Sequence, residues 1–197
     1  ISNVQWVIAD ARNEESVFDL FFQNRPDVVI NCVGINYSPG PIEDCSAVDW
    51  YDKVGDNLIP WYAMIRSASR YHSAYPSKLL LIALGSNSAF VPRSLSSAYC
   101  VSKAAMLSLT QNAARDFGKQ EKDIYVVQVD PGFVYPSGMG DDWLHEKGKT
   151  IEDMVYRSPY KKCVDLHQLV KLICFLVEDG HGEMFTGQSI RFDYAEV

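Results

Sequence analysis

The stretch around which this chain is organised reads Ser97-Ala-Tyr99-Cys-Val-Ser-Lys103, and helix-forming residues continue from it to Gly118. The stretch contains no proline, and a glycine commonly stands where a helix ends. Tyr99 and Lys103 are four residues apart, so on a helix both side chains project from one face. An ammonium group beside a phenol favours the phenolate and lowers a pKa that is otherwise about 10. The pair is therefore suited to proton transfer near neutral pH, although two solvated residues on a surface helix have the same spacing.

Strand-like and helix-like patterns alternate outward from this stretch. Buried strands are expected at 4–9, 27–33, 78–84, 123–129 and 188–192. Helices are expected at 14–23, 46–73, 97–118 and 165–178, the second with a kink or break at Pro60. The central strands are apolar on both faces, which predicts a doubly wound α/β fold, a parallel sheet covered by helices on both sides, as one domain over 1–197. Residues 133–162 are rich in Gly, Pro and charge and are expected to form an irregular substrate loop or lid.

The composition is that of a single soluble globular domain, with 47% hydrophobic and 22% charged residues. The net charge is -7 and no basic run stands out, which argues against nucleic acid or an anionic membrane as a partner. Because no apolar run is long enough to span a bilayer and no signal peptide is recognisable, we expect a cytoplasmic protein. Five scattered cysteines are typical of reduced thiols, and four widely separated histidines give no reason to expect a metal site.

Polar residues and glycines gather where the expected strands end. Ligands of open α/β sheets bind at the carboxyl ends of the strands, so these residues are candidates for a binding site. Each of them also has an ordinary explanation as part of a turn or loop. The residues concerned are Asp10, Asn31, Gly34, Ser86, Pro131 and Gly132.

In their order and spacing, these motifs resemble those of the short-chain dehydrogenase/reductase family over nearly the whole chain. Ser86 precedes Tyr99 by 13 residues, the family's usual interval, and Asn57 lies in the preceding helix as the family's active-site asparagine does. The other matching motifs are Asn31-Cys-Val-Gly34, Tyr99-Cys-Val-Ser-Lys103, Pro131-Gly-Phe-Val134 and Phe185-Thr-Gly-Gln188. The resemblance implies an oxidoreductase that uses NAD or NADP to interconvert a carbonyl group and a secondary alcohol.

The same resemblance implies a role for each catalytic residue. Ser86 would bind the substrate oxygen, and Tyr99 would exchange a proton with it. Lys103 would hold the nicotinamide ribose and keep the pKa of Tyr99 low. Asn57 would anchor a water that connects Lys103 to solvent.

It also implies a binding site for the cofactor. Asp10 would meet the adenine amino group, Asn31 and Gly34 would line the adenosine ribose, and Val134 would contact the nicotinamide amide. Tyr99, Lys103, Pro131 and Gly132 complete the cofactor set. Side chains that could contact the substrate are Ser88, Tyr135, Met139 and Trp143.

The beginning of the chain departs from the family pattern. The family's first strand, its glycine-rich phosphate loop, the next helix and the second strand have no counterpart here, and the residue that separates NAD from NADP follows that second strand. In the family's strand order 3-2-1-4-5-6, the two missing strands lie between the strand expected at 4–9 and the strand expected at 27–33. Unpaired central edges destabilise a sheet. We therefore expect further residues before this segment, or a rearranged sheet, or a partner that supplies the strands.

Three smaller departures lie near the site and at the end of the chain. Pro136, with Ser137 beside it, stands where the family often has a threonine that binds the nicotinamide carboxamide, and Gly85 replaces the usual serine before Ser86. The chain ends in Phe192-Asp-Tyr-Ala-Glu-Val197 where many members end in Asp-Gly-Gly.

Three other classes of protein remain as alternatives. A non-catalytic relative that senses a dinucleotide or assembles with a partner would share the fold, and an epimerase or dehydratase would share Tyr-x-x-x-Lys but has a longer substrate domain. A serine hydrolase would need a second glycine after Ser86, which is absent. The family resemblance further implies a homodimer or homotetramer formed through the helices at 46–73 and 97–118, with a second contact at the last strand.

Overall fold

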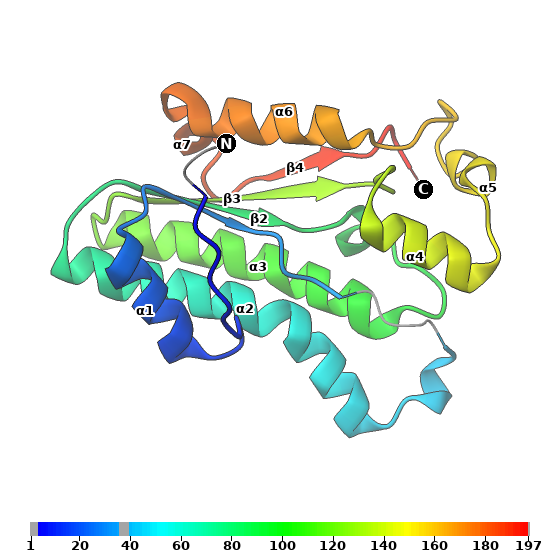
Figure 1. The fold of residues 1–197 in the computed structure, drawn as a ribbon, viewed down its shortest axis with the longest axis horizontal. Coiled ribbons are helices and arrows are strands. Elements are labelled where there is room, and N and C mark those ends of the chain that lie inside the picture. The colour runs from blue at the N-terminus through cyan, green and yellow to red at the C-terminus, as the bar shows by residue number, and fades with distance from the viewer. Residues whose placement is uncertain (1–3, 36–39, 197) are drawn as a thin grey trace.

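The computed structural model describes residues 4–35 and 40–196, and a parallel sheet of four strands lies at its centre (Figure 1). The strands pair in chain order, with Val28 beside Leu80, Leu80 beside Tyr125, and Gln128 beside Ser189. Their bounds are β1 Val28–Asn31, β2 Leu79–Leu84, β3 Ile124–Pro131 and β4 Ser189–Phe192. The doubly wound α/β fold is confirmed.

Alternate residues of β2 serve two separate hydrophobic cores. Leu79, Leu81 and Ala83 pack in a core with the helices on one face of the sheet. Those helices are α1 Glu14–Asn24, α2 Ala47–Ala74 and α3 Ser97–Lys119. Leu80 and Ile82 pack in the second core, toward α6 Leu166–Val177, which lies with α7 His181–Met184 on the opposite face (Figure 1). Because successive side chains of a strand point to opposite faces, an unbroken apolar strand builds both cores at once.

The segment at 133–162 is more regular than expected. It contains the helices α4 Gly138–Lys147 and α5 Ile151–Val155, so the expectation of an irregular loop is wrong. Both helices have capped N-termini: the Ser137 side chain accepts a hydrogen bond from Gly140 N, and Thr150 and Asp153 form a capping box. These caps offset the weak helix propensity of a segment rich in Gly and charge.

Two other local predictions concern residues 4–9 and Pro60. The strand expected at 4–9 is wrong: these residues are exposed, with Trp6 at 90% and Ile8 at 103% of full exposure, because no described strand lies beside them to pair with their backbone. Of the kink or break expected at Pro60, the break is absent, since α2 continues through it as one helix of 28 residues. Pro60 removes a single N–H donor, while its buried neighbour Trp61 anchors the helix by donating from Nε1 to Thr110 Oγ1 of α3 over 3.0 Å.

Two further features complete the fold. Ile30 on β1 is 42% exposed, and β1 is an edge strand within the part of the chain that the structure describes. Across residues 4–35 and 40–196, no helix is both long and apolar enough to cross a bilayer.

Candidate active site

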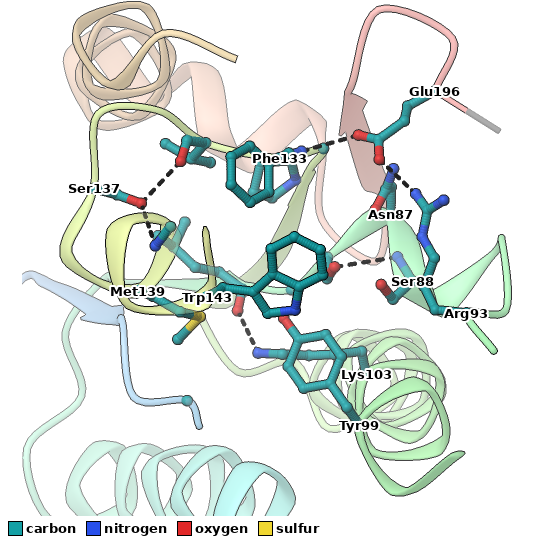
Figure 2. A pocket seen from close by; sticks show the side chains of 18 of the residues that line it. Asn87, Ser88, Arg93, Tyr99, Lys103, Phe133, Ser137, Met139, Trp143 and Glu196 are labelled. Carbon is teal, nitrogen blue, oxygen red and sulfur yellow. Dashed lines mark hydrogen bonds and ion pairs between the residues drawn. The ribbon is translucent and has the colours of Figure 1, made fainter. Parts of the chain in front are cut away.

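A cavity of about 410 Å³ opens at the carboxyl ends of the strands (Figure 2). It has the size of a small-molecule site. Most of the residues predicted from the sequence line it, and they come from several of the segments that carry the family motifs. These lining residues are Gly34, Ser86, Ser88, Tyr99, Lys103, Pro131, Gly132, Val134, Met139 and Trp143.

Ser86 stands at the point where β2 ends. Its backbone is extended, and its Oγ accepts a hydrogen bond from Ser88 N over 3.1 Å, which starts the 3₁₀ helix Asn87–Ala89. The Ser86 side chain is also close enough to the Tyr99 hydroxyl to oppose the rise in the pKa of that phenol. The strand end and the short helix together direct the Ser86 hydroxyl toward the phenol.

Tyr99 and Lys103 lie one turn apart near the start of α3, as their spacing predicts (Figure 2). Lys103 is only 3% exposed, and its Nζ donates to the carbonyl oxygen of Leu84 over 3.1 Å. The same Nζ is 5.7 Å from the centre of the Tyr99 ring. The end of β2 therefore holds the ammonium group beside the phenol.

Burial dominates the protonation of both groups. It lowers the pKa of Lys103 to about 8, against the opposing electrostatic effects of Asp130 and Cys32. Burial also raises the pKa of Tyr99, although its hydrogen bond with Ser86 acts in the other direction. The expected lowering of the Tyr99 pKa is therefore wrong for this structure, because desolvation of the phenol outweighs every favourable contact.

Asn57, on α2, holds the chain that follows β1. Its Oδ1 accepts a hydrogen bond from Ile35 N over 2.9 Å, and its Nδ2 donates to Ile35 O over 3.0 Å. Beside this contact, Gly34 passes so close that a Cβ there would lie 3.2 Å from both Asn57 Oδ1 and Lys103 Nζ. Asn57 does not line the cavity, but it positions the glycine that does.

Asn31 supports the expectation that the end of β1 binds a ligand. The residue is fully buried, and its Oδ1 accepts a hydrogen bond from Val33 N over 3.0 Å. Its Nδ2 has no hydrogen-bond partner among the described residues. This buried donor lies three residues before Gly34, which packs closely against Asn57 and Lys103. Buried donors are rarely left unpaired, so the site fits a ligand with hydroxyl or other acceptor oxygens, such as a ribose.

Four predicted residues do not line the cavity: Asn31 and Asn57, described above, and Asp10 and Tyr135. Asp10 is exposed in the N-terminal segment, where its Oδ1 accepts a hydrogen bond from Arg12 N over 2.9 Å. Tyr135 is half-buried, and its backbone N–H donates to Val164 O over 2.9 Å. Within the described part of the chain, no three His, Cys, Asp or Glu side chains are grouped so that they could hold a metal ion.

Asp130 on β3 is a buried residue beside the site that the motifs do not reveal. Its Oδ1 accepts hydrogen bonds from Ser86 N and from Gln128 Nε2, each over 2.8 Å, and its Oδ2 accepts one from Ser189 Oγ. Burial raises the pKa of its carboxyl group, and the three donors oppose that shift. The sequence carries no local signal for this residue, because the glycine that makes room for its carboxylate, Gly85, lies at the end of the neighbouring strand.

The cavity is also lined by residues that the sequence did not predict. Arg93, Arg157 and Glu196 line it beside Met139 and Trp143 of α4. They come from segments that lie far apart in the sequence and carry no family motif. Only the folded chain brings them together.

Comparison with known proteins agrees with the fold and the motifs. Residues 2–194 match the family model described as enoyl-(acyl carrier protein) reductase. The chain therefore belongs to the short-chain dehydrogenase/reductase family.

The individual relatives share less than 30% of their residues with this chain over the matched regions. The chain is 29% identical to L-xylulose reductase of Caenorhabditis elegans over 113 residues, which are 57% of this chain and 43% of that protein. It is 27% identical to 2,3-dihydro-2,3-dihydroxybenzoate dehydrogenase of Bacillus subtilis over 164 residues, 80% of this chain and 61% of that protein. A solved structure of 4-hydroxyisoleucine dehydrogenase complexed with NADH superposes with a TM-score of 0.78 at 23% identity and covers 96% of this chain and 80% of the other. The chain thus spans about half the length of the curated relatives that it matches.

Proposed function

We propose that this chain carries the catalytic residues of an NAD- or NADP-dependent oxidoreductase that interconverts a carbonyl group and a secondary alcohol. One observation carries the proposal: Ser86, Tyr99 and Lys103 line a single cavity at the carboxyl end of the sheet. Membership of the family and the activities named for the curated relatives support it.

The residues that would hold the cofactor are Asn31 and Gly34 after β1, Lys103 on α3, and the turn from Pro131 to Val134 after β3. The unpaired Nδ2 of Asn31 and the NADH in the structure of 4-hydroxyisoleucine dehydrogenase support this assignment. When bound, the nicotinamide would supply or accept the hydride. NAD and NADP are both compatible with the residues present.

Tyr99 is the residue that we assign to proton transfer, with Ser86 donating a hydrogen bond to the substrate oxygen. Because burial raises its pKa, the Tyr99 phenol is protonated at neutral pH and is ready to give its proton to a developing alkoxide. The protonated phenol is the form that acts as the general acid when a carbonyl is reduced. Lys103, with a pKa of about 8, is mostly charged at that pH and stabilises negative charge that develops on the phenol oxygen.

Asn57 has a supporting role in this proposal. It fixes Ile35 and thereby keeps Gly34 against Lys103, and a water at this place would connect Lys103 to solvent as a proton relay. The exposed side chains Tyr51 and Tyr62 on α2 and Val101 on α3 support a homodimer or homotetramer formed through these two helices. We further propose a cytoplasmic location and a small-molecule substrate.

The test is an activity assay of the protein with a panel of small molecules. Ketones and aldehydes are assayed with NADH and with NADPH, and secondary alcohols are assayed with the oxidised forms of both cofactors. We expect turnover with at least one pair, and a loss of at least about a hundredfold for Tyr99→Phe with unchanged thermal unfolding. Tyr156→Phe, at a tyrosine that is 71% exposed, is the matched control and retains full activity. A Tyr99→Phe variant as active as the wild type would overturn the mechanism, and cofactor binding without any turnover would favour a dinucleotide sensor.

A further inference from the structure

Two arginines line the same cavity as Ser86 and Tyr99. Arg93 follows the 3₁₀ helix Asn87–Ala89, and Arg157 follows α5. Their side chains are 18% and 34% exposed, so both guanidinium groups are partly withdrawn from water. Partly buried cations need anionic partners, because desolvation penalises an uncompensated charge.

The two arginines share one protein carboxylate. Glu196 Oε1 lies 2.7 Å from Arg93 Nη2 but 3.9 Å from Arg157 Nη1 (Figure 2 shows the contact to Arg93). The second oxygen of Glu196 accepts a hydrogen bond from Phe133 N over 2.9 Å. Glu196 therefore makes a close ion pair with Arg93 and only a long contact with Arg157.

The charge balance of the cavity leaves room for another anion. Among the described residues that line it, Arg93, Lys103 and Arg157 are basic and Glu196 is acidic. The carboxylate of Asp130 acts on Lys103, so the two arginines face Glu196 as their shared carboxylate in the lining. Burial lowers the pKa of the Arg157 guanidinium, and the positive charge of Arg93 lowers it further, against the opposing effect of Glu196. A second negative charge beside Arg157 would relieve both unfavourable effects.

Aromatic rings lie beside the Arg157 guanidinium. The guanidinium carbon is 5.3 Å from the centre of the Trp143 ring, and Trp143 meets Phe133 edge to face at 6.0 Å. The contact with Trp143 restricts the orientation of the planar guanidinium of Arg157. With its orientation fixed, two N–H groups of this guanidinium can donate in parallel to two oxygens of a carboxylate or phosphate. The rings themselves offer an apolar wall for the carbon skeleton of a ligand.

We propose that the substrate of this enzyme carries an oxyanion group, a carboxylate or a phosphate, which binds to Arg157 beside Trp143, with Arg93 contributing to the positive potential. This inference rests on the proposed function only in its placement of the reacting oxygen at Ser86 and Tyr99. Neutral substrates of the same shape bind more weakly, because they leave Arg157 with its single distant carboxylate.

Equilibrium binding tests the proposal without any turnover. We would titrate the protein with benzoate, phenyl phosphate and the neutral benzamide at constant ionic strength, and follow the heat of binding. We expect the better of the two anions to bind at least about tenfold more tightly than benzamide, and the ranking of the two anions to separate a carboxylate site from a phosphate site. Equal binding of all three compounds, or no binding of either anion, would overturn the proposal.

Variants assign the effect to the site. Arg157→Gln is expected to abolish the preference for anions, whereas Arg115→Gln, which removes an exposed positive charge on α3, retains it. Glu196→Gln keeps an acceptor for Phe133 N but removes the competing negative charge, so it is expected to raise anion affinity several-fold. Because binding is measured without turnover, the result can be read whether or not the protein is an oxidoreductase. An Arg157→Gln variant with the same preference as Arg115→Gln would show that the arginine pair is not the anion site.

Discussion

The backbone N–H of Ser86 donates to Oδ1 of Asp130 over 2.8 Å, and the residue before Ser86 has no side chain that could intervene. A Cβ on Gly85 would lie 2.5 Å from Nε2 of Gln128 and closer still to Oδ1 of Asp130. The buried carboxylate and the glycine are therefore a matched pair. Together they fix the end of β2 and the direction of Ser86.

Gly85→Ala is expected to destabilise the protein by about 2 kcal/mol or more, because the new methyl group overlaps buried atoms that cannot move freely. Thermal or urea unfolding measures the effect. Gly118→Ala is the matched control: a Cβ at this position would have no described atom within 4 Å beyond its own helix and neighbours, so this change leaves stability equal or slightly higher. Equal stability of the two variants would contradict the close fit at Gly85.

Ser86→Ala is expected to lower kcat/KM by about 10² to 10³, because the substrate oxygen loses a hydrogen-bond donor in the transition state. Ser88→Ala is expected to change kcat/KM much less, since Ser88 contacts Ser86 through its backbone N–H and keeps that group in the variant. Steady-state kinetics of the two variants side by side decide the matter. A larger loss for Ser88→Ala would move the oxygen-binding role to that residue.

Lys103 is expected to make stability depend on pH in the alkaline range. Its pKa is about 8 in the folded protein, against an ordinary value of 10.5, so between these values the unfolded chain binds more protons. Stability therefore rises with pH from about 8 toward 10, by at most about 1.4 kcal/mol per pH unit. Urea unfolding of the wild type and of Lys103→Met at several pH values measures this effect. Between pH 8 and 10 the free energy of unfolding of the wild type is expected to rise relative to that of the variant. Below pH 8 the difference between the two free energies is expected to stay constant. Lys119→Met, at an exposed lysine on the last turn of α3, controls for the loss of a charge, and a difference that stays flat across the window would contradict the lowered pKa.

Asn57→Ala is expected to lower the free energy of unfolding by about 2 kcal/mol, because the backbone N–H and carbonyl of Ile35 both lose their partner. The same change is expected to weaken cofactor binding, since Gly34 is no longer held against Lys103. Urea unfolding and fluorescence titration with NADH measure the two effects. Asn112→Ala, at an exposed position of α3, is the control, and indistinguishable unfolding of the two variants would rule out the anchoring role.

Features set by local periodicity could be predicted from the sequence. The four-residue spacing of Tyr99 and Lys103 places both on one helix face, and the apolar run before Ser86 places that serine at a strand end. Both follow from the geometry of the backbone alone. The strands and long helices of the core were predicted to within a few residues for the same reason.

Features that depend on distant neighbours could not be predicted. Whether residues 4–9 pair as a strand is decided by what lies beside them, and no pattern within the segment carries that information. Asp130 follows an apolar run as an ordinary strand-end residue would, although its importance comes from Gly85 at the end of the neighbouring strand. Arg157 meets its partners Arg93 and Glu196 only after the chain has folded. The sequence contains the residues that cap α4 and α5, Ser137 and Thr150. The glycines and prolines of the same segment nevertheless favoured the prediction of a loop over that of two helices.

The close fit at Gly85 ties three positions of this site together in evolution. A side chain at position 85 would overlap both Asp130 and Gln128, so it is compatible with the fold only if those two residues also change. A change at position 130 made alone would in turn remove the carboxylate that accepts the hydrogen bond from Ser86 N. Laboratory evolution that sets out to place a serine at position 85 must therefore vary positions 85, 128 and 130 together.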